Sequence, residues 1–129
     1  MKIHHIAIWA KDIEKMKAFY IRYFNCTSGN KYINHAKLFE SYFLDFENGT
    51  RLEIMSIPQL KENSEQKKEI YAGINHFAIS TGSQDSVNEL TEKLKNDGYT
   101  IMSHPRRTGD GYFESVVLDP EGNRIEITE

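Results

Sequence analysis

Two histidines and two glutamates occupy matching places in the two halves of this 129-residue chain. Each half has a histidine in an early apolar stretch, His5 or His76, and a glutamate between two apolar residues in a late stretch, Glu53 or Glu126. The histidine-to-glutamate interval is 48 positions in the first half and 50 in the second. Imidazole and carboxylate ligands suit Zn²⁺, Ni²⁺, Co²⁺, Fe²⁺ or Mn²⁺, whereas Ca²⁺ prefers oxygen ligands alone. We therefore expect these four residues to bind one divalent metal ion.

Alternation along the expected strands puts the four side chains on equivalent faces. Side chains point to opposite faces in turn, so His5, Ala7 and Trp9 share one face of a strand expected over Ile3 to Trp9. His76 has the same relation to the strand expected over Asn75 to Thr81. A single strand histidine is more often a surface or core residue, and alternation alone produces a glutamate between apolar neighbours. The repetition of both types in register favours the metal site.

The elements that must position these residues follow the same order twice. A strand, a helix and three further strands fill the first half, with the helix expected over Asp12 to about Phe24. The second half repeats this order, with a helix from about Ser83 to Asn96 and turns at Asn48-Gly49 and Asp119-Pro120-Glu121-Gly122. The prediction is an α+β fold in which two βαβββ modules form a cupped mixed sheet around a metal site, with the helices on the outside. We expect one domain over 1–129, comprising module 1 (1–57), a polar linker (58–72) and module 2 (73–129).

Composition narrows the class of protein. The hydrophobic and charged fractions, 39% and 27%, are those of a globular domain, and no apolar run reaches the roughly 20 residues of a membrane span. The net charge of −3 argues against a nucleic-acid partner. Cys26 is the one cysteine, and the N-terminus lacks the pattern of a signal peptide, so a cytoplasmic location is expected.

Three sequence strings resemble the vicinal-oxygen-chelate superfamily, which contains glyoxalase I, fosfomycin-resistance proteins and extradiol dioxygenases. They are Ile3-His4-His5-Ile6-Ala7-Ile8, Ile74-Asn75-His76-Phe77-Ala78-Ile79 and Leu118-Asp119-Pro120-Glu121-Gly122-Asn123-Arg124-Ile125-Glu126-Ile127. The resemblance extends over essentially the whole chain. It implies paired βαβββ modules, a small-molecule substrate and a homodimer, in which the ligands of one site come from one subunit or from two.

A set of two histidines and two glutamates is most similar to that of glyoxalase I. The resemblance implies a lyase or isomerase of the lactoylglutathione lyase type, with Zn²⁺ or Ni²⁺ first among the metals. Such an enzyme moves a proton within an α-oxo thiohemiacetal through an enediolate that the metal stabilises. The base is Glu126 or Glu53, with Glu126 preferred.

Other residues bear on the substrate. Glyoxalase I typically has Arg and Asn where this chain has Trp9 and Ile57, and these apolar residues cannot anchor the glutathione carboxylate. Glutathione is therefore not favoured as the thiol. Trp9 and Met55 either line the substrate pocket or, in the case of Trp9, pack in the core, and Arg106 and Arg107 either bind an anionic group or are solvated loop residues. Two alternatives stay open: a thiol transferase or acyl-CoA epimerase on the same metal platform, and a metal-independent antibiotic-binding protein of the bleomycin-resistance type.

Overall fold

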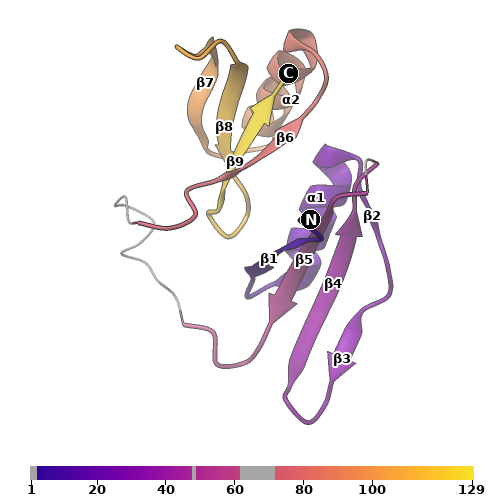
Figure 1. Ribbon diagram of the computed structural model, residues 1–129. Coiled ribbons are helices and arrows are strands. Elements are labelled where there is room, and N and C mark those ends of the chain that lie inside the picture. Colours follow the sequence, from indigo (N-terminus) through magenta and orange to yellow (C-terminus); the bar gives the residue numbers. More distant parts are fainter. Residues whose placement is uncertain (1–2, 48, 62–71) are drawn as a thin grey trace. The chain divides into compact units, whose positions relative to one another are not determined.

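The computed structural model describes residues 3–47, 49–61 and 72–129, which form nine strands and two helices (Figure 1). The chain groups into two compact units, Met1–Glu62 and Asn63–Glu129, called here the first and second modules. The central part of the expected linker, 62–71, lies outside the described residues. The expected single domain with its modules at 1–57 and 73–129 stays a prediction.

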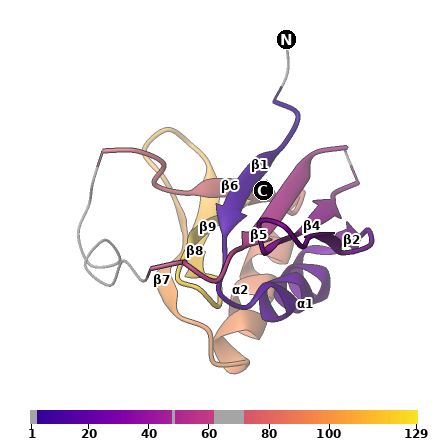
Figure 2. The same cartoon turned by 90° about the horizontal axis from the view of Figure 1, so that it is seen from below.

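The first module is a mixed sheet with one helix against it (Figures 1 and 2). Its elements are β1 (Ile6–Trp9), α1 (Ile13–Phe24), β2 (Thr27–Ser28), β3 (Tyr32–Asn34), β4 (Phe39–Asp45) and β5 (Arg51–Ser56). The sheet order is β1-β5-β4-β2, and β3 also pairs with β4. β1 runs parallel to β5, and the remaining pairs are antiparallel.

The second module repeats this plan. Its elements are β6 (Phe77–Ser80), α2 (Gln84–Asn96), β7 (Ile101–Arg107), β8 (Phe113–Leu118) and β9 (Arg124–Thr128). The sheet order is β6-β9-β8-β7, with β6 parallel to β9 and the other pairs antiparallel. The expected α+β architecture of two βαβββ modules is therefore confirmed, with a separate mixed sheet in each module.

Local sequence explains where both helices begin. The Asp12 side chain accepts a hydrogen bond from the Lys15 amide at 2.9 Å, and the Ser83 side chain accepts one from the Ser86 amide at 3.1 Å. Each side chain satisfies an amide that the first helical turn leaves unpaired, which fixes the start of the helix. Both expected helices are confirmed.

The apolar stripe of each helix packs on the sheet of its own module. α1 contributes Met16 and Tyr20, which are fully buried, against the side of β4 and β5 that bears Leu44 and Ile54. In the second module the fully buried aliphatic residues are Val87, Leu94, Val117, Ile125 and Ile127. Each such aliphatic side chain contributes roughly 1.5–3 kcal/mol when it is buried. Because alternate strand residues face opposite ways, Glu53 and Glu126 lie on the sheet face away from the helix, called here the ligand face.

The structure differs from the sequence expectations at strand ends. β1 and β6 begin at Ile6 and Phe77, so His5 and His76 stand immediately before their strands rather than within them. The second strand position of the first module holds two short strands, β2 and β3, because the regular pairing with β4 is interrupted between Gly29 and Tyr32. The Asp119 turn is confirmed by the Gly122 amide, which donates to the Asp119 carbonyl at 3.0 Å. Of the Asn48-Gly49 turn, Asn48 lies outside the described residues.

Neither helix in the described part of the chain has the length and apolar character that crossing a bilayer requires.

Candidate metal centre

The first module brings His5 and Glu53 together. Nε2 of His5 lies 3.8 Å from Oε2 of Glu53, and Nδ1 of the same ring lies 2.8 Å from Nδ1 of His4. Ala7 pairs with Glu53 across β1 and β5. His5, two positions before Ala7, therefore lies on the same face of the sheet as Glu53. The ring of Phe43, which pairs with Glu53 on its other side, stands edge-on to the His5 ring at 5.3 Å. These contacts fix the imidazole with Nε2 toward the carboxylate.

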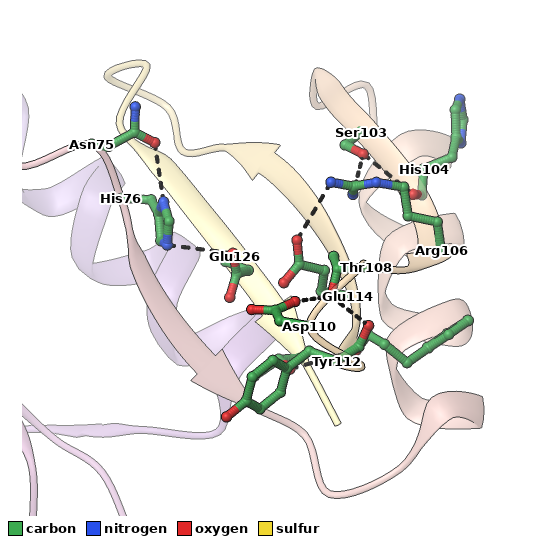
Figure 3. A network of polar contacts seen from close by, with 12 residues as sticks. Asn75, His76, Ser103, His104, Arg106, Thr108, Asp110, Tyr112, Glu114 and Glu126 are labelled. Carbon is green, nitrogen blue, oxygen red and sulfur yellow. Dashed lines mark hydrogen bonds and ion pairs between the residues drawn. The ribbon is translucent and has the colours of Figure 1, made fainter. Parts of the chain in front are cut away.

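The second module builds the same pair from His76 and Glu126 (Figure 3). Nε2 of His76 lies 3.3 Å from Oε2 of Glu126, and Nδ1 lies 3.0 Å from Oδ1 of Asn75. Ala78 pairs with Glu126, as Ala7 pairs with Glu53. In both modules the residue before the histidine thus binds Nδ1, and Nε2 faces the glutamate.

These distances suit two ligands of one metal ion. Two donors that each lie about 2.1 Å from a tetrahedral ion are roughly 3.4 Å apart, which is the range of both pairs. An acceptor on the second imidazole nitrogen, as Asn75 provides for His76, is the usual support of a metal-binding histidine. The same distances also fit an ordinary ion pair with a protonated histidine, so the geometry permits a metal ion without requiring one.

The structure establishes two pairs rather than a group of four. Across residues 3–47, 49–61 and 72–129, no three histidine, cysteine or acidic side chains are grouped to hold a metal ion. His5 is brought to Glu53, and His76 to Glu126, each within its own module. The meeting of all four residues at one ion therefore stays a prediction.

Glu114 is a second carboxyl group on the ligand face of the second module, beside Glu126, and it was not predicted from the sequence. It lies on β8 opposite Thr128, two residues along the sheet from the Val116–Glu126 pair. Burial and the negative charge of Glu126 raise the pKa of Glu114, and the nearby Arg106 guanidinium opposes this increase. Oε1 of Glu114 lies 3.5 Å from Nη2 of Arg106 (Figure 3). The Asp119 turn between β8 and β9 was a partial signal, but the register that brings Glu114 near Glu126 comes from the pairing of the folded strands.

The two adjacent arginines have different surroundings. Arg106 donates to Oγ of Ser103 at 2.5 Å and pairs with Glu114, which places it on the ligand face. Arg107 donates to the carbonyl of Gly111 at 2.6 Å and lies 3.5 Å from Oε1 of Glu129. Neighbouring strand residues point to opposite faces, so only Arg106 accompanies Glu126. A substrate contact by either arginine stays a prediction.

Trp9 and Met55 are adjacent on the ligand face of the first module. They pair across β1 and β5, two residues beyond the Ala7–Glu53 pair. The half-exposed Trp9 ring meets Phe39 edge-on at 6.3 Å, and Phe39 in turn meets Tyr32 at 6.1 Å. This row of rings gives the module an apolar area beside Glu53, consistent with the expected substrate contacts, which stay predictions.

A cavity of about 580 Å³ in the first module lies away from these residues. Its lining includes Lys11, Ile33, Leu38, Glu40 and Ile57, and none of the predicted ligands. Ile33 pairs with Glu40, which pairs with Ser56, so this part of the wall belongs to the helix side of the sheet. The structure therefore places Ile57 in a cavity separate from the His5–Glu53 pair.

Comparison with known proteins identifies the family. The model of the Glyoxalase/Bleomycin resistance protein/Dioxygenase superfamily matches residues 2–127. Protein YwkD of Bacillus subtilis, described as uncharacterized, is 41% identical over 134 residues that cover 98% of this chain and 95% of that protein.

Solved structures show the same fold. A glyoxalase family protein from Enterococcus faecalis has a TM-score of 0.79 at 22% identity, covering 99% of this chain and 97% of that one. Glyoxalase I from Zea mays has a TM-score of 0.80 at 21% identity, and the match covers 98% of this chain but 44% of the maize chain. At these identities the likeness concerns the fold alone. Because the family model matches residues 2–127, nearly all of this chain, the chain belongs to the Glyoxalase/Bleomycin resistance protein/Dioxygenase superfamily.

Proposed function

We propose that this protein is a divalent-metal-dependent lyase or isomerase, similar to glyoxalase I, that acts on an α-oxo thiohemiacetal. The observation that supports this most is the repetition of one arrangement, histidine Nε2 against glutamate Oε2, at 3.8 Å in one module and 3.3 Å in the other. Both modules therefore direct one imidazole nitrogen and one carboxylate oxygen toward each other, which is the arrangement that two ligands of one ion require.

In this proposal His5, Glu53, His76 and Glu126 hold one Zn²⁺ or Ni²⁺ ion, with Co²⁺, Mn²⁺ or Fe²⁺ as alternatives. The ion would supply Lewis-acid stabilisation of the negative charge that develops on the substrate oxygens. His4 and Asn75 orient the two imidazoles by binding Nδ1. Glu126 or Glu53 takes the proton from the carbon beside the carbonyl group and returns it to the neighbouring carbon.

We prefer Glu126 as the base because its surroundings are the more polar. Glu114 stands near it on the same face of the sheet, at the position where the first module has Ser41. A neighbouring carboxyl group can accept or supply the proton that the base exchanges, and a hydroxyl group does so less readily.

The aromatic row at Trp9 favours a thiol other than glutathione. An indole ring beside Glu53 offers no donor fork for a carboxylate, but it offers apolar surface to a small thiol conjugate. The same observation supports two alternatives, an acyl-CoA epimerase or thiol transferase with the same metal ion, and an antibiotic-binding protein without it. Ligand binding that survives removal of metal by a chelator would favour the last.

The first experiment is metal analysis of the purified protein beside Glu126→Gln and His76→Gln. One Zn, Ni or Co per chain in the wild type and its loss in both variants is the expected result. Glu92→Gln is the matched control, because Glu92 lies exposed on α2 and pairs with Lys95. Absence of metal from the wild type after reconstitution, or equal metal in every variant, contradicts the proposal.

The proposed enzyme is a cytoplasmic homodimer. The strands that follow the two histidines, β1 and β6, each stand at the end of the strand order of their own sheet. Light scattering measures the dimer. Mixing His5→Gln with His76→Gln chains then tests shared ligands, because restored metal binding requires a site made from two subunits.

A further inference from the structure

Glu114 occupies a place in the second module that differs in chemistry from its counterpart in the first. Ser41 pairs with Met55, two residues beyond Glu53, and Glu114 pairs with Thr128, two residues beyond Glu126. The two positions are thus equivalent, and a carboxyl group in one replaces a hydroxyl group in the other. The two modules have the same histidine–glutamate pair. They differ in the residue near the glutamate, which is Glu114 in the second module and Ser41 in the first.

Keeping a carboxyl group at this place is costly. Only 9% of Glu114 is exposed, and Glu126 lies on the same face of the adjacent strand. Two adjacent carboxyl groups removed from water destabilise a fold unless a cation and hydrogen bonds compensate them. An apolar residue such as Val116, which pairs with Glu126 on the same face, would avoid that cost. Costly polar residues of this kind are characteristic of functional sites.

An irregular strand positions the compensating arginine. The register of β7 against β8 shifts twice, between Ile101 and Ser103 and between Ser103 and Arg106. In a regular strand, residues three positions apart point to opposite faces, yet Ser103 and Arg106 are hydrogen-bonded at 2.5 Å. The bulge therefore brings Arg106 to the side of Glu114, where Nη2 lies 3.5 Å from Oε1 (Figure 3). Bulges beside active sites commonly redirect a side chain in this way.

We propose that Glu114 is a specificity-determining residue whose carboxyl group hydrogen-bonds a hydroxyl group of the substrate, next to the two oxygens that bind the metal ion. The proposal rests on the proposed function, because it assumes a substrate held at Glu126. Glu114 shares the ligand face with Glu126 and lies two residues along the neighbouring strand from the partner of Glu126, so a molecule bound there meets both side chains. A hydroxyl group both donates and accepts, which makes it a fitting partner for a carboxyl group.

The charges around Glu114 also decide whether a neutral or an anionic substrate is favoured. In the proposed site three carboxyl groups, Glu53, Glu114 and Glu126, face one divalent ion and the Arg106 guanidinium. These positive charges are offset by the carboxylates, so a further carboxylate or phosphate beside Glu114 gains little attraction and meets like charge. The expected substrate is therefore an α-oxo compound with a neutral hydroxyl-bearing substituent, and Arg106 serves to position Glu114.

The test uses metal-chelating hydroxamates, whose two adjacent oxygens imitate the chelating part of such a substrate. Glycolohydroxamate carries a hydroxyl group where propionohydroxamate of similar size carries a methyl group, and malonate monohydroxamate carries a carboxylate. Calorimetric titration of the metal-reconstituted full chain gives a dissociation constant for each. A hydrogen bond to a charged group predicts that the wild type binds glycolohydroxamate at least about tenfold more tightly than propionohydroxamate, and more tightly than the anionic probe.

The variants separate this proposal from the metal site itself. Glu114→Gln is expected to keep its metal and to reduce the preference for the hydroxyl probe to about threefold or less, because a neutral amide makes a weaker hydrogen bond. Ser41→Ala, the matched change in the first module, should keep the full preference. Equal binding of the two neutral probes by the wild type, an undiminished preference in Glu114→Gln, or tighter binding of the anionic probe overturns the role of Glu114. A wild type that binds neither metal nor hydroxamate overturns the proposed function and this inference together.

Discussion

The imidazole Nε2 of His76 lies 3.3 Å from Oε2 of Glu126 while its Nδ1 is held by the preceding residue, and His5 has the same relation to Glu53. One imidazole nitrogen is thus fixed by a local neighbour and the other is directed toward a carboxylate from a strand far along the chain. In the proposed metal site, each module would thus supply one oriented histidine–glutamate pair. It also leads to a prediction about the local neighbour.

Asn75→Ala is expected to weaken metal binding although Asn75 is not a proposed ligand. The substitution removes the acceptor on Nδ1 of His76, and loss of such a supporting group typically reduces metal affinity about 10–100-fold. Competition with a chromophoric chelator measures this affinity. Asn88→Ala, at an exposed position on α2, is the control and should leave it unchanged. Equal affinities in the two variants would show that Asn75 does not support the site.

Glu14 is expected to stabilise the fold in a pH-dependent manner. Hydrogen bonds from Lys17, Lys31 and Tyr42 lower its pKa to about 2. Because the folded-state pKa is below the unfolded value, the stabilisation is complete above about pH 4.5–5 and declines as the pH falls toward 2. Thermal unfolding of the wild type and Glu14→Gln should differ most at neutral pH and converge near pH 2. The effect is modest because Glu14 is half-exposed and solvent screens it.

Glu92→Gln provides the comparison for that series. Glu92 also pairs with a lysine, Lys95, but on an exposed helix surface without the additional partners of Glu14. Its substitution should change the melting temperature little at any pH. A melting-temperature difference for Glu14→Gln that persists unchanged at pH 2 would contradict the role given to the Glu14 carboxylate.

The Cys26 thiol is expected to be unreactive in the folded protein. Burial raises its pKa to about 11, so very little thiolate is present at neutral pH, and the side chain is shielded from reagents. Reaction with a disulfide reagent at pH 8 should be slow for the native chain and at least about tenfold faster in denaturant. A native rate equal to that of the unfolded chain would show that the helix–sheet contact around Cys26 opens readily.

Asp119 is expected to be essential to the turn that precedes β9. It is buried, and its carboxylate accepts from the amides of Glu121 and Asn123 and from Nδ2 of Asn123 at 2.8–2.9 Å. Asp119→Ala leaves these donors without their acceptor and should lower the free energy of unfolding by about 1–3 kcal/mol. Denaturant titration measures this change. Asp110→Ala, in an exposed loop, is the control, and an equal loss in both variants would remove the special role of the turn.

Local sequence determined the elements and their order. Asp12 and Ser83 mark the helix starts because a side-chain oxygen next to a helix amide acts within one turn of chain. Asp119 and Gly122 mark a turn for the same local reason. The alternation of side chains along the strands placed Glu53 and Glu126 on the sheet face away from the helices. The resemblance to the superfamily was enough to predict the two βαβββ modules.

Tertiary structure alone decided which side chains surround the glutamates. Phe43 beside His5, Glu114 beside Glu126 and the separation of Arg106 from Arg107 all depend on strand register. Register is a long-range property, since the two register shifts of β7 against β8 change which residues share a face without any periodic signal in the sequence. The sequence by itself thus determined the ligand types and the strands that carry them. Only the folded sheets decided that a third carboxyl group stands next to one of those ligands, because hydrogen bonding between distant strands sets that contact.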